Sequence, residues 1–250
     1  MSPFLKSIPN FTTSLFIWTF IAIDTLFVFL LLAILRPLDP DQRFSYRIAN
    51  FWGSSIIWIN PFWSLKITDA DYIKKKKGYV LVANHMSLAD IVCLFGLGKN
   101  FKWLAKKSLF KIPVFGWTMS LLNYIPLSRG KHGSIRDSFQ EAQRWLEKDI
   151  PVLIFPEGTR SRTGTLGEFK NGAFKLAILT KKPIIPIVIR GTGEAIARGK
   201  MTVSTHVKGS IKVLAPIETK NFEPDQYEAL RLKVWNLMNG EISGVSKTSD

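Results

Sequence analysis

Apolar residues form one long run near the start of the chain. In residues 15–35, only Thr19, Asp24 and Thr25 are not apolar. As an α-helix, these 21 residues can cross the hydrocarbon core of a bilayer, which takes about 20 residues. Residues 36–40 read Arg-Pro-Leu-Asp-Pro, which is not the small-residue cleavage site of a signal peptide. The pattern predicts a retained, membrane-associated helix whose Asp24 carboxylate faces protein, water or headgroups.

A second helical pattern covers residues 43–63, where apolar positions are interleaved with small and polar ones. Three tryptophans, Trp52, Trp58 and Trp63, suit a membrane–water interface. An ordinary helix that packs on the protein core is the alternative. With the Pro-rich turn between the two patterns, residues 1–63 are predicted to form a two-helix membrane anchor at one face of a bilayer.

From residue 64 onwards, short runs of β-type residues alternate with stretches of helical periodicity. The candidate strands are residues 65–68, 79–83, 102–105, 124–127, 151–155, 184–190 and 211–215. The candidate helices are residues 88–97, 113–122, 134–148, 171–180 and 225–239. Helices between strands are typical of an α/β domain. Residues 64–250 are therefore predicted to form one α/β domain, with a mixed, partly parallel sheet flanked by helices.

The amino-acid composition and net charge limit the kinds of molecule that the chain is expected to bind. The chain has 250 residues, of which 46% are hydrophobic, so it can build a substantial core. Its 34 basic and 19 acidic residues give a net charge of +15, and nine of these charges lie in residues 66–132. Such a balance favours polyanionic partners: nucleic acid, an anionic membrane or phosphorylated substrates. A single cysteine, Cys93, excludes an internal disulfide, and with three histidines a multi-histidine metal centre is not expected.

The first candidate site lies in residues 80–90, which read as a strand, a turn and the start of a helix. His85 falls at the carboxyl end of the strand, where α/β sheets usually bind ligands. Ser87 and Asp90 have the spacing of a capping box, so Asp90 could simply accept backbone N–H groups. The same geometry lets Asp90 orient the His85 ring and make it a general base. Spacing alone leaves both interpretations open.

The second candidate site follows the apolar strand at residues 151–155 and reads Pro-Glu-Gly-Thr-Arg. Gly158 permits a positive φ or close backbone approach, and Thr159 offers a hydroxyl. Arg160 supplies a bidentate fork that suits phosphate. A β-turn with surface arginines is the alternative. By itself this motif indicates an anion site only weakly.

Taken together, these segments resemble the glycerolipid acyltransferases, and the 1-acylglycerol-3-phosphate acyltransferases in particular. Residues 84–90 match the family's N-H-x-S-x-x-D block, and residues 155–160 match its F-P-E-G-T-R block. Residues 106–129 resemble the intermediate block, and residues 182–187 the final proline-containing strand. The blocks occur in family order. One departure is Asn123, where the family often has Gly, and Asn tolerates left-handed backbone better than most residues.

The resemblance implies acyl transfer from acyl-CoA or acyl carrier protein to the sn-2 hydroxyl of lysophosphatidic acid, which makes phosphatidic acid. His85 would be the general base and Asp90 its orienting partner. The implied substrate contacts are Asn84, Lys106, Arg129, Phe155, Glu157, Gly158, Thr159 and Arg160. No metal or cofactor is expected, and the membrane bilayer is the expected partner, with the catalytic domain on the cytoplasmic face of the inner membrane.

Two alternatives to this function stay open. The acceptor could be another lysophospholipid or glycerol 3-phosphate. A basic module that binds a membrane surface or nucleic acid, without catalysis, is the non-enzyme alternative. Nucleic acid is disfavoured because the aromatic residues concentrate in the first 63 residues and not among the lysines, so the stacking platform of a single-strand binder is missing.

Overall fold

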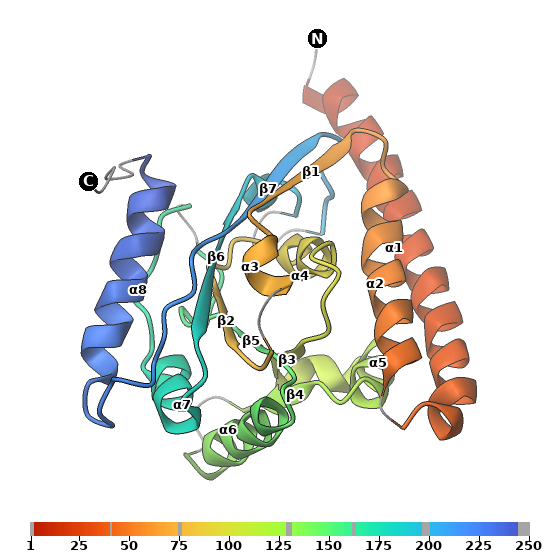
Figure 1. The fold of residues 1–250 in the computed structure, drawn as a ribbon. Coiled ribbons are helices and arrows are strands. Elements are labelled where there is room, and N and C mark those ends of the chain that lie inside the picture. The colour runs from red at the N-terminus through yellow and green to blue at the C-terminus, as the bar shows by residue number, and fades with distance from the viewer. Residues whose placement is uncertain are drawn as a thin grey trace.

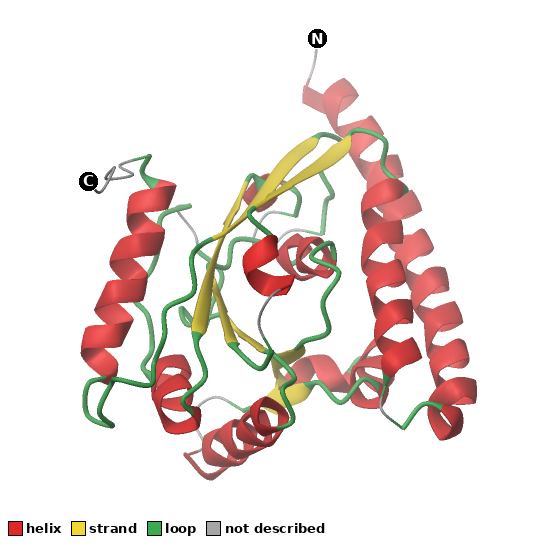
Figure 2. Cartoon of the chain, in the orientation of Figure 1, coloured by secondary structure: helices red, strands yellow, loops and turns green. Residues whose placement is uncertain are grey.

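The computed structural model describes residues 3–40, 42–74, 77–128, 132–161, 164–196 and 201–244. Helices and strands alternate along most of the chain, and the strands form one sheet through the middle of the molecule (Figures 1 and 2). The strands are β1 (Trp63–Thr68), β2 (Val80–Ala83), β3 (Lys102–Lys106), β4 (Ile125–Leu127), β5 (Val152–Ile154), β6 (Ile184–Arg190) and β7 (Val207–Val213).

The α-helices are α1 (Pro3–Leu35), α2 (Arg43–Trp58), α3 (Asp71–Lys74), α4 (Ala89–Phe95), α5 (Phe115–Leu121), α6 (His132–Glu147), α7 (Gly172–Thr180) and α8 (Tyr227–Ile242). Short 3-10 turns are η1 (Arg36–Leu38), η2 (Lys107–Lys111) and η3 (Thr192–Glu194). Most of these elements lie within a few residues of the predicted ones, and β6 has the predicted bounds.

The strand order is β1-β7-β6-β2-β5-β3-β4. Neighbouring strands are parallel except β6 and β7, which are antiparallel. The sheet is therefore mixed and largely parallel, which confirms the predicted fold class. Because β5, β2 and β6 run side by side in the same direction, the loops that follow them leave from one edge of the sheet. In α/β proteins this carboxyl edge is where ligands bind.

The side chains of β2 alternate between two apolar layers. Leu81 and Ala83 pack in a core that α1, α2 and α4 share, whereas Val80 and Val82 pack in a second core with α6, α7 and α8. Figure 1 shows the same division, with these two groups of helices on opposite sides of the sheet. All four β2 side chains are fully buried, so residues 80–83 read as a continuous apolar run.

Two predicted boundaries are wrong. Helix α2 ends at Trp58 and not at residue 63, because a residue before proline, here Asn60, is disfavoured in the α region. The last strand was predicted at residues 211–215, but β7 begins at Val207. Its buried positions alternate with exposed ones, and one of the buried positions is Gly209, which hides the apolar pattern.

Helices α1 and α2 form an antiparallel hairpin that packs against the sheet domain (Figure 1). Two polar residues of α1 face α2: Ser55 donates to the Asp24 carboxylate at 2.7 Å, and the Trp52 indole donates to Thr25 at 3.0 Å. Asp24 therefore faces protein, as expected. Where α2 crosses α4, a Cβ at Gly53 would lie 2.4 Å from the Phe95 Cβ, so this close contact needs glycine.

The outer face of the hairpin is apolar. Its exposed large side chains are Phe11, Leu15, Phe16, Ile23, Leu26, Phe27, Leu30 and Ile34 in α1, and Phe44, Phe51 and Trp58 in α2. In the described residues, one segment, Phe11–Leu38, is long and apolar enough to cross a membrane by length and composition. That α1 and α2 together form an anchor, and that a domain boundary lies at residue 63, stay predictions.

Candidate active site

Asn84 ties the end of β2 to β6. Its side-chain amide donates to the Ile189 carbonyl at 2.9 Å and accepts from the Ile189 N–H at 2.8 Å. The side chain is buried, and both its polar atoms are engaged with the sheet. The Asn84 side chain therefore holds the loop that carries His85, and its predicted contact with substrate stays a prediction.

His85 and Asp90 form the predicted dyad. The Nδ1 atom of His85 lies 2.7 Å from Oδ2 of Asp90, whose side chain is fully buried. A carboxylate accepts from a protonated Nδ1, which leaves Nε2 as the basic nitrogen of the ring. The His85 side chain is 17% exposed, so a substrate can reach it. This is the arrangement of a general base with its orienting carboxylate.

The same carboxylate also caps the start of α4. Oδ2 of Asp90 accepts the backbone N–H groups of Met86 at 2.7 Å and Ser87 at 2.9 Å. Oδ1 accepts the hydroxyl of Thr192 at 2.6 Å. The two interpretations left open by the sequence therefore hold together, because one buried acceptor serves the helix and the histidine.

The other nucleophile candidates near His85 are occupied or inert. The Ser87 hydroxyl is fully buried, donates to the Ile196 carbonyl and accepts from the Ala89 N–H. Burial raises the pKa of the Cys93 thiol to about 12, with the Asp90 charge as a smaller cause. Neither side chain can become a nucleophile easily, which fits direct attack by a substrate hydroxyl activated by His85.

Phe155, the residue after β5, stacks on the imidazole ring of His85. Their ring centroids lie 4.2 Å apart, and the planes are inclined by 23°. Since Asp90 holds one edge of the ring and Phe155 covers one face, the ring orientation is fixed from two directions. The predicted role of Phe155 in binding substrate is thus joined by an observed contact with the catalytic ring.

Glu157 holds the backbone around His85. Its two carboxylate oxygens accept the His85 N–H and the Gly167 N–H, each at 2.9 Å. Burial raises the pKa of Glu157, and the two N–H donors oppose that rise. The Ser161 N–H also donates to the His85 carbonyl at 2.7 Å. The Glu157 carboxylate thus fastens the second motif to the first, and its predicted contact with substrate stays a prediction.

The remaining predicted ligands lie in loops or strand ends at the carboxyl edge of the sheet, except Arg129, which is not described. Gly158 has a φ of 67°, which confirms the positive φ expected for it. Thr159 is exposed and Arg160 is half-buried in the loop after β5. Lys106 is exposed at the carboxyl end of β3, on the same edge of the sheet. Arg129 lies outside the described residues, so its predicted contact stays a prediction.

Two residues near the site were missed from the sequence. Thr192 lies in η3 after β6, and the signal was available, since a hydroxyl follows a strand predicted to end at residue 190. Lys170 is the other: its side chain lies over Gly158, with Nζ 3.2 Å from where a Cβ would stand. Lys170 adds a positive charge beside Gly158 that the motif alone does not reveal.

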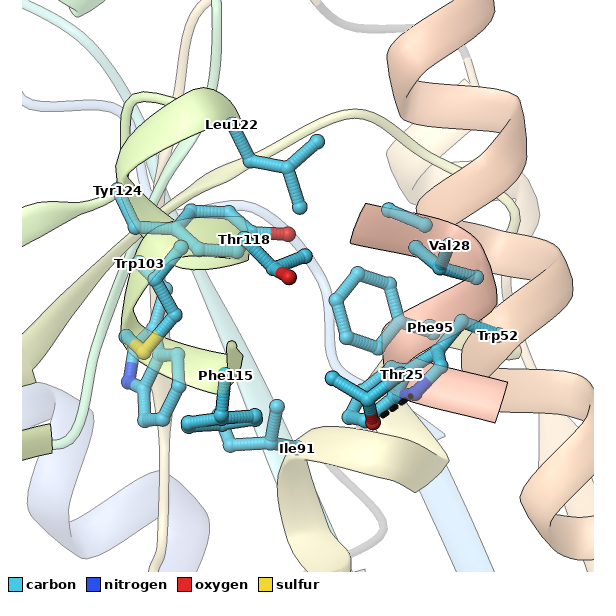
Figure 3. Close-up of a pocket in the computed structure, with 12 residues that line it drawn as sticks. Thr25, Val28, Trp52, Ile91, Phe95, Trp103, Phe115, Thr118, Leu122 and Tyr124 are labelled. Atoms are coloured by element: carbon cyan, nitrogen blue, oxygen red, sulfur yellow. Dashed lines mark hydrogen bonds between the residues drawn. The ribbon is translucent and has the colours of Figure 1, made fainter. Parts of the chain in front are cut away.

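An apolar cavity adjoins helix α4 (Figure 3). It lies between α1, α2, α4 and α5. Ile91, the residue after Asp90, is part of its wall. The rest of the lining is Thr25, Val28, Ala49, Trp52, Phe95, Trp103, Phe115, Thr118, Met119, Leu122 and Tyr124. The lining is almost entirely apolar, and His85 is not part of it.

Comparisons with known proteins agree with this geometry. The chain is 37% identical over 198 residues to the chloroplastic 1-acyl-sn-glycerol-3-phosphate acyltransferase LPAT1 of Arabidopsis thaliana, covering 77% of this chain and 54% of that protein. It is 31% identical over 228 residues to an uncharacterized acyltransferase of Schizosaccharomyces pombe, covering 90% and 81%. The chain spans about half the length of the first curated relatives it matches.

The fold is similar to the crystal structure of the 1-acyl-sn-glycerophosphate acyltransferase PlsC from Thermotoga maritima. The TM-score is 0.81 at 26% sequence identity, over 98% of this chain and 99% of the other. Residues 64–190 match the family model described as Acyltransferase, and both catalytic candidates lie inside this range. The chain therefore belongs to the acyltransferase family.

Proposed function

We propose that the chain transfers a fatty acyl group from a thioester to the sn-2 hydroxyl of 1-acylglycerol 3-phosphate, which yields phosphatidic acid. The observation that carries the proposal is His85, held through Nδ1 by the buried Asp90 carboxylate at 2.7 Å and left with a basic Nε2. Basic side chains beside it suit a phosphorylated acceptor. Relatives that carry the name 1-acyl-sn-glycerol-3-phosphate acyltransferase support the choice of acceptor.

The reaction follows from this geometry. Nε2 of His85 takes the proton from the acceptor hydroxyl, and the oxygen attacks the thioester carbonyl. When the tetrahedral intermediate collapses, the C–S bond breaks, the ester forms, and the imidazolium returns the proton to the leaving thiolate. Asp90 stabilises the imidazolium between these steps. General-base assistance of this kind typically contributes about 10²–10⁴-fold, and no step requires a metal or cofactor.

The phosphate of the acceptor would lie against the loop after β5. Arg160 offers a bidentate fork, and Gly158 and Thr159 form the adjacent backbone. Lys106, Lys170 and Arg129 supply further positive charge in this proposal.

The acceptor and product are membrane lipids, so the site must work at a bilayer surface. The exposed apolar face of α1 and α2 supports a place at the membrane, because contiguous patches of this kind mark lipid or partner contacts. We propose that the hairpin of α1 and α2 inserts from the cytoplasmic face of the inner membrane and leaves the catalytic domain in the cytoplasm, where acyl-CoA and acyl carrier protein are found.

Cysteine labelling in a Cys93→Ser background tests this topology. Ser2→Cys and Ser64→Cys should both resist an impermeant external reagent in intact cells, and labelling of Ser2→Cys alone would show a spanning first helix.

A direct assay tests the function. Purified full-length chain is supplied with radiolabelled acyl-CoA or acyl carrier protein and a panel of acceptors: lysophosphatidic acid, other lysophospholipids and glycerol 3-phosphate. We expect labelled phosphatidic acid from lysophosphatidic acid, and loss of nearly all turnover in His85→Ala. His206→Ala, which removes an exposed histidine, is the control and should keep activity. Preference for another acceptor would correct the substrate, and full activity of His85→Ala would overturn the mechanism.

A further inference from the structure

We propose that Thr192 is a positioning residue for the acyl transfer, and that its hydroxyl fixes the carboxylate on which His85 depends. The inference rests on the proposed function. Thr192 is fully buried, so it cannot be reached by a substrate, and it acts through Asp90. The dyad is thereby extended to a third side chain that comes from another part of the chain.

The contacts of Asp90 divide between its two oxygens. Oδ2 serves the segment just before it, through His85, Met86 and Ser87. Oδ1 accepts the Thr192 hydroxyl at 2.6 Å, from a residue 102 positions further along the chain. A carboxylate held at both oxygens cannot rotate about its Cβ–Cγ bond. The Thr192 hydroxyl therefore keeps Oδ2 in the plane where it meets the imidazole.

The position of Thr192 depends on the sharp turn at Gly191, directly after β6. Gly191 has a φ of 77°, and a Cβ there would stand 2.0 Å from the Lys208 carbonyl oxygen of β7. Only glycine fits such a position without moving the backbone. The chain can therefore turn sharply at the end of β6 and place Thr192 beneath the start of α4.

Strand β6 and the turn that follows it thus hold both ends of the His85 segment. Ile189 binds the Asn84 side chain on the amino side, and Thr192 binds Asp90 on the carboxyl side. A shift of about 1 Å in a catalytic group can lower a rate by about a hundredfold. Loss of the Thr192 hydroxyl should consequently lower kcat and leave the KM for lysophosphatidic acid nearly unchanged.

The test compares three variants of the full-length chain. Thr192→Val keeps the size of the side chain and removes the donor, and Thr192→Ser keeps the hydroxyl. Thr219→Val is a matched control, because Thr219 is also fully buried and donates only to the backbone carbonyls of Ala177 and Lys182. We expect kcat to fall about tenfold to a hundredfold in Thr192→Val, to recover to within about threefold of wild type in Thr192→Ser, and to stay unchanged in Thr219→Val.

A spectroscopic measurement makes the test independent of turnover. The chain has three histidines, so ¹⁵N-histidine labelling gives few ring signals, and His85→Ala identifies those of His85. The Nδ1 proton that His85 shares with Asp90 should shift in Thr192→Val and not in Thr219→Val. Unchanged kcat and an unchanged His85 signal in folded Thr192→Val would overturn the proposal, as would equal losses of kcat in both valine variants. A wild-type chain inactive on every acceptor would refute the proposed function and leave the histidine signal to decide the role of Thr192.

Discussion

Replacement of Asp90 by Asn should lower kcat by about 10³–10⁴-fold without disturbing the fold. The two side chains have the same shape, and the structure dictates how the amide would sit. Three donors converge on Oδ2, so the Asn carbonyl must take that position. The amide NH₂ then faces Thr192, whose hydroxyl oxygen can turn to accept it. Only the negative charge is lost.

The magnitude follows from that charge. Two opposite unit charges about 4 Å apart attract by about 4 kcal/mol at an effective dielectric constant of about 20. That energy stabilises the imidazolium formed when His85 takes the proton, and each 1.36 kcal/mol corresponds to about a tenfold change in rate. The expected loss is about 10³-fold from charge alone. The analogous change in serine-protease triads lowers kcat by about 10⁴-fold, partly through the wrong tautomer.

The assay is steady-state turnover of purified Asp90→Asn at saturating acyl donor, with circular dichroism and Tm measured on the same samples. Asp149→Asn is the matched control, since Asp149 is an exposed aspartate paired with Lys182 far from His85 in the sequence. It should keep wild-type kcat. If Asp90→Asn loses only Tm and stays within tenfold of wild-type kcat, Asp90 is a helix cap and the dyad assignment is wrong.

Three further predictions concern the acceptor, a buried lysine and the apolar face. Arg160→Ala should raise the KM for lysophosphatidic acid well over tenfold, because a charge-assisted pair contributes about 1.5–3 kcal/mol; equal rises for donor and acceptor would place Arg160 elsewhere. Burial lowers the pKa of Lys102 to about 7 from 10.5, so the unfolded chain binds more protons between these values. The free energy of unfolding in urea should therefore rise by up to about 1.4 kcal/mol per pH unit from pH 7 to about 8.5. Lys102→Met should reduce this pH dependence. The same pH dependence in Lys102→Met as in wild type would contradict the lowered pKa of Lys102. Leu26→Ser with Leu30→Ser should lower co-sedimentation with phosphatidylcholine–phosphatidylglycerol vesicles at least about tenfold, whereas Leu232→Ser on the exposed side of α8 should not; equal effects would rule out the α1 face as the lipid contact.

Local features of the site could be predicted from the sequence. The strand, turn and helix around His85 and the positive φ of Gly158 all depend on residues close together in the chain. Asn123 likewise has a φ of 53°, as expected for an asparagine that replaces glycine. Short-range sterics and apolar periodicity determine such features, so they can be predicted from a single sequence.

Contacts across the sheet could not be predicted in the same way. The Asn84 and Glu157 side chains bond to the backbone of Ile189 and His85, 105 and 72 residues away, and the sequence does not indicate these partners. Periodicity tells which positions are buried and does not tell which strands are neighbours. Only the order β6-β2-β5 brings these residues together. Once that order is known, Thr192 and Phe155 also fall beside His85.

The spacing between His85 and Asp90 has a physical reason in the start of α4. A carboxylate in the first turn of a helix reaches back to the free N–H groups before it, here those of Met86 and Ser87. The imidazole of His85 joins them as a third donor on the same oxygen. Capping of this kind contributes about 1 kcal/mol and holds the carboxylate in place before any substrate arrives. One residue inserted between His85 and Asp90 would turn the carboxylate by about 100° around the helix axis. The cap and the hydrogen bond that orients His85 would then be lost together, so folding of this turn and the proposed catalysis require the same spacing.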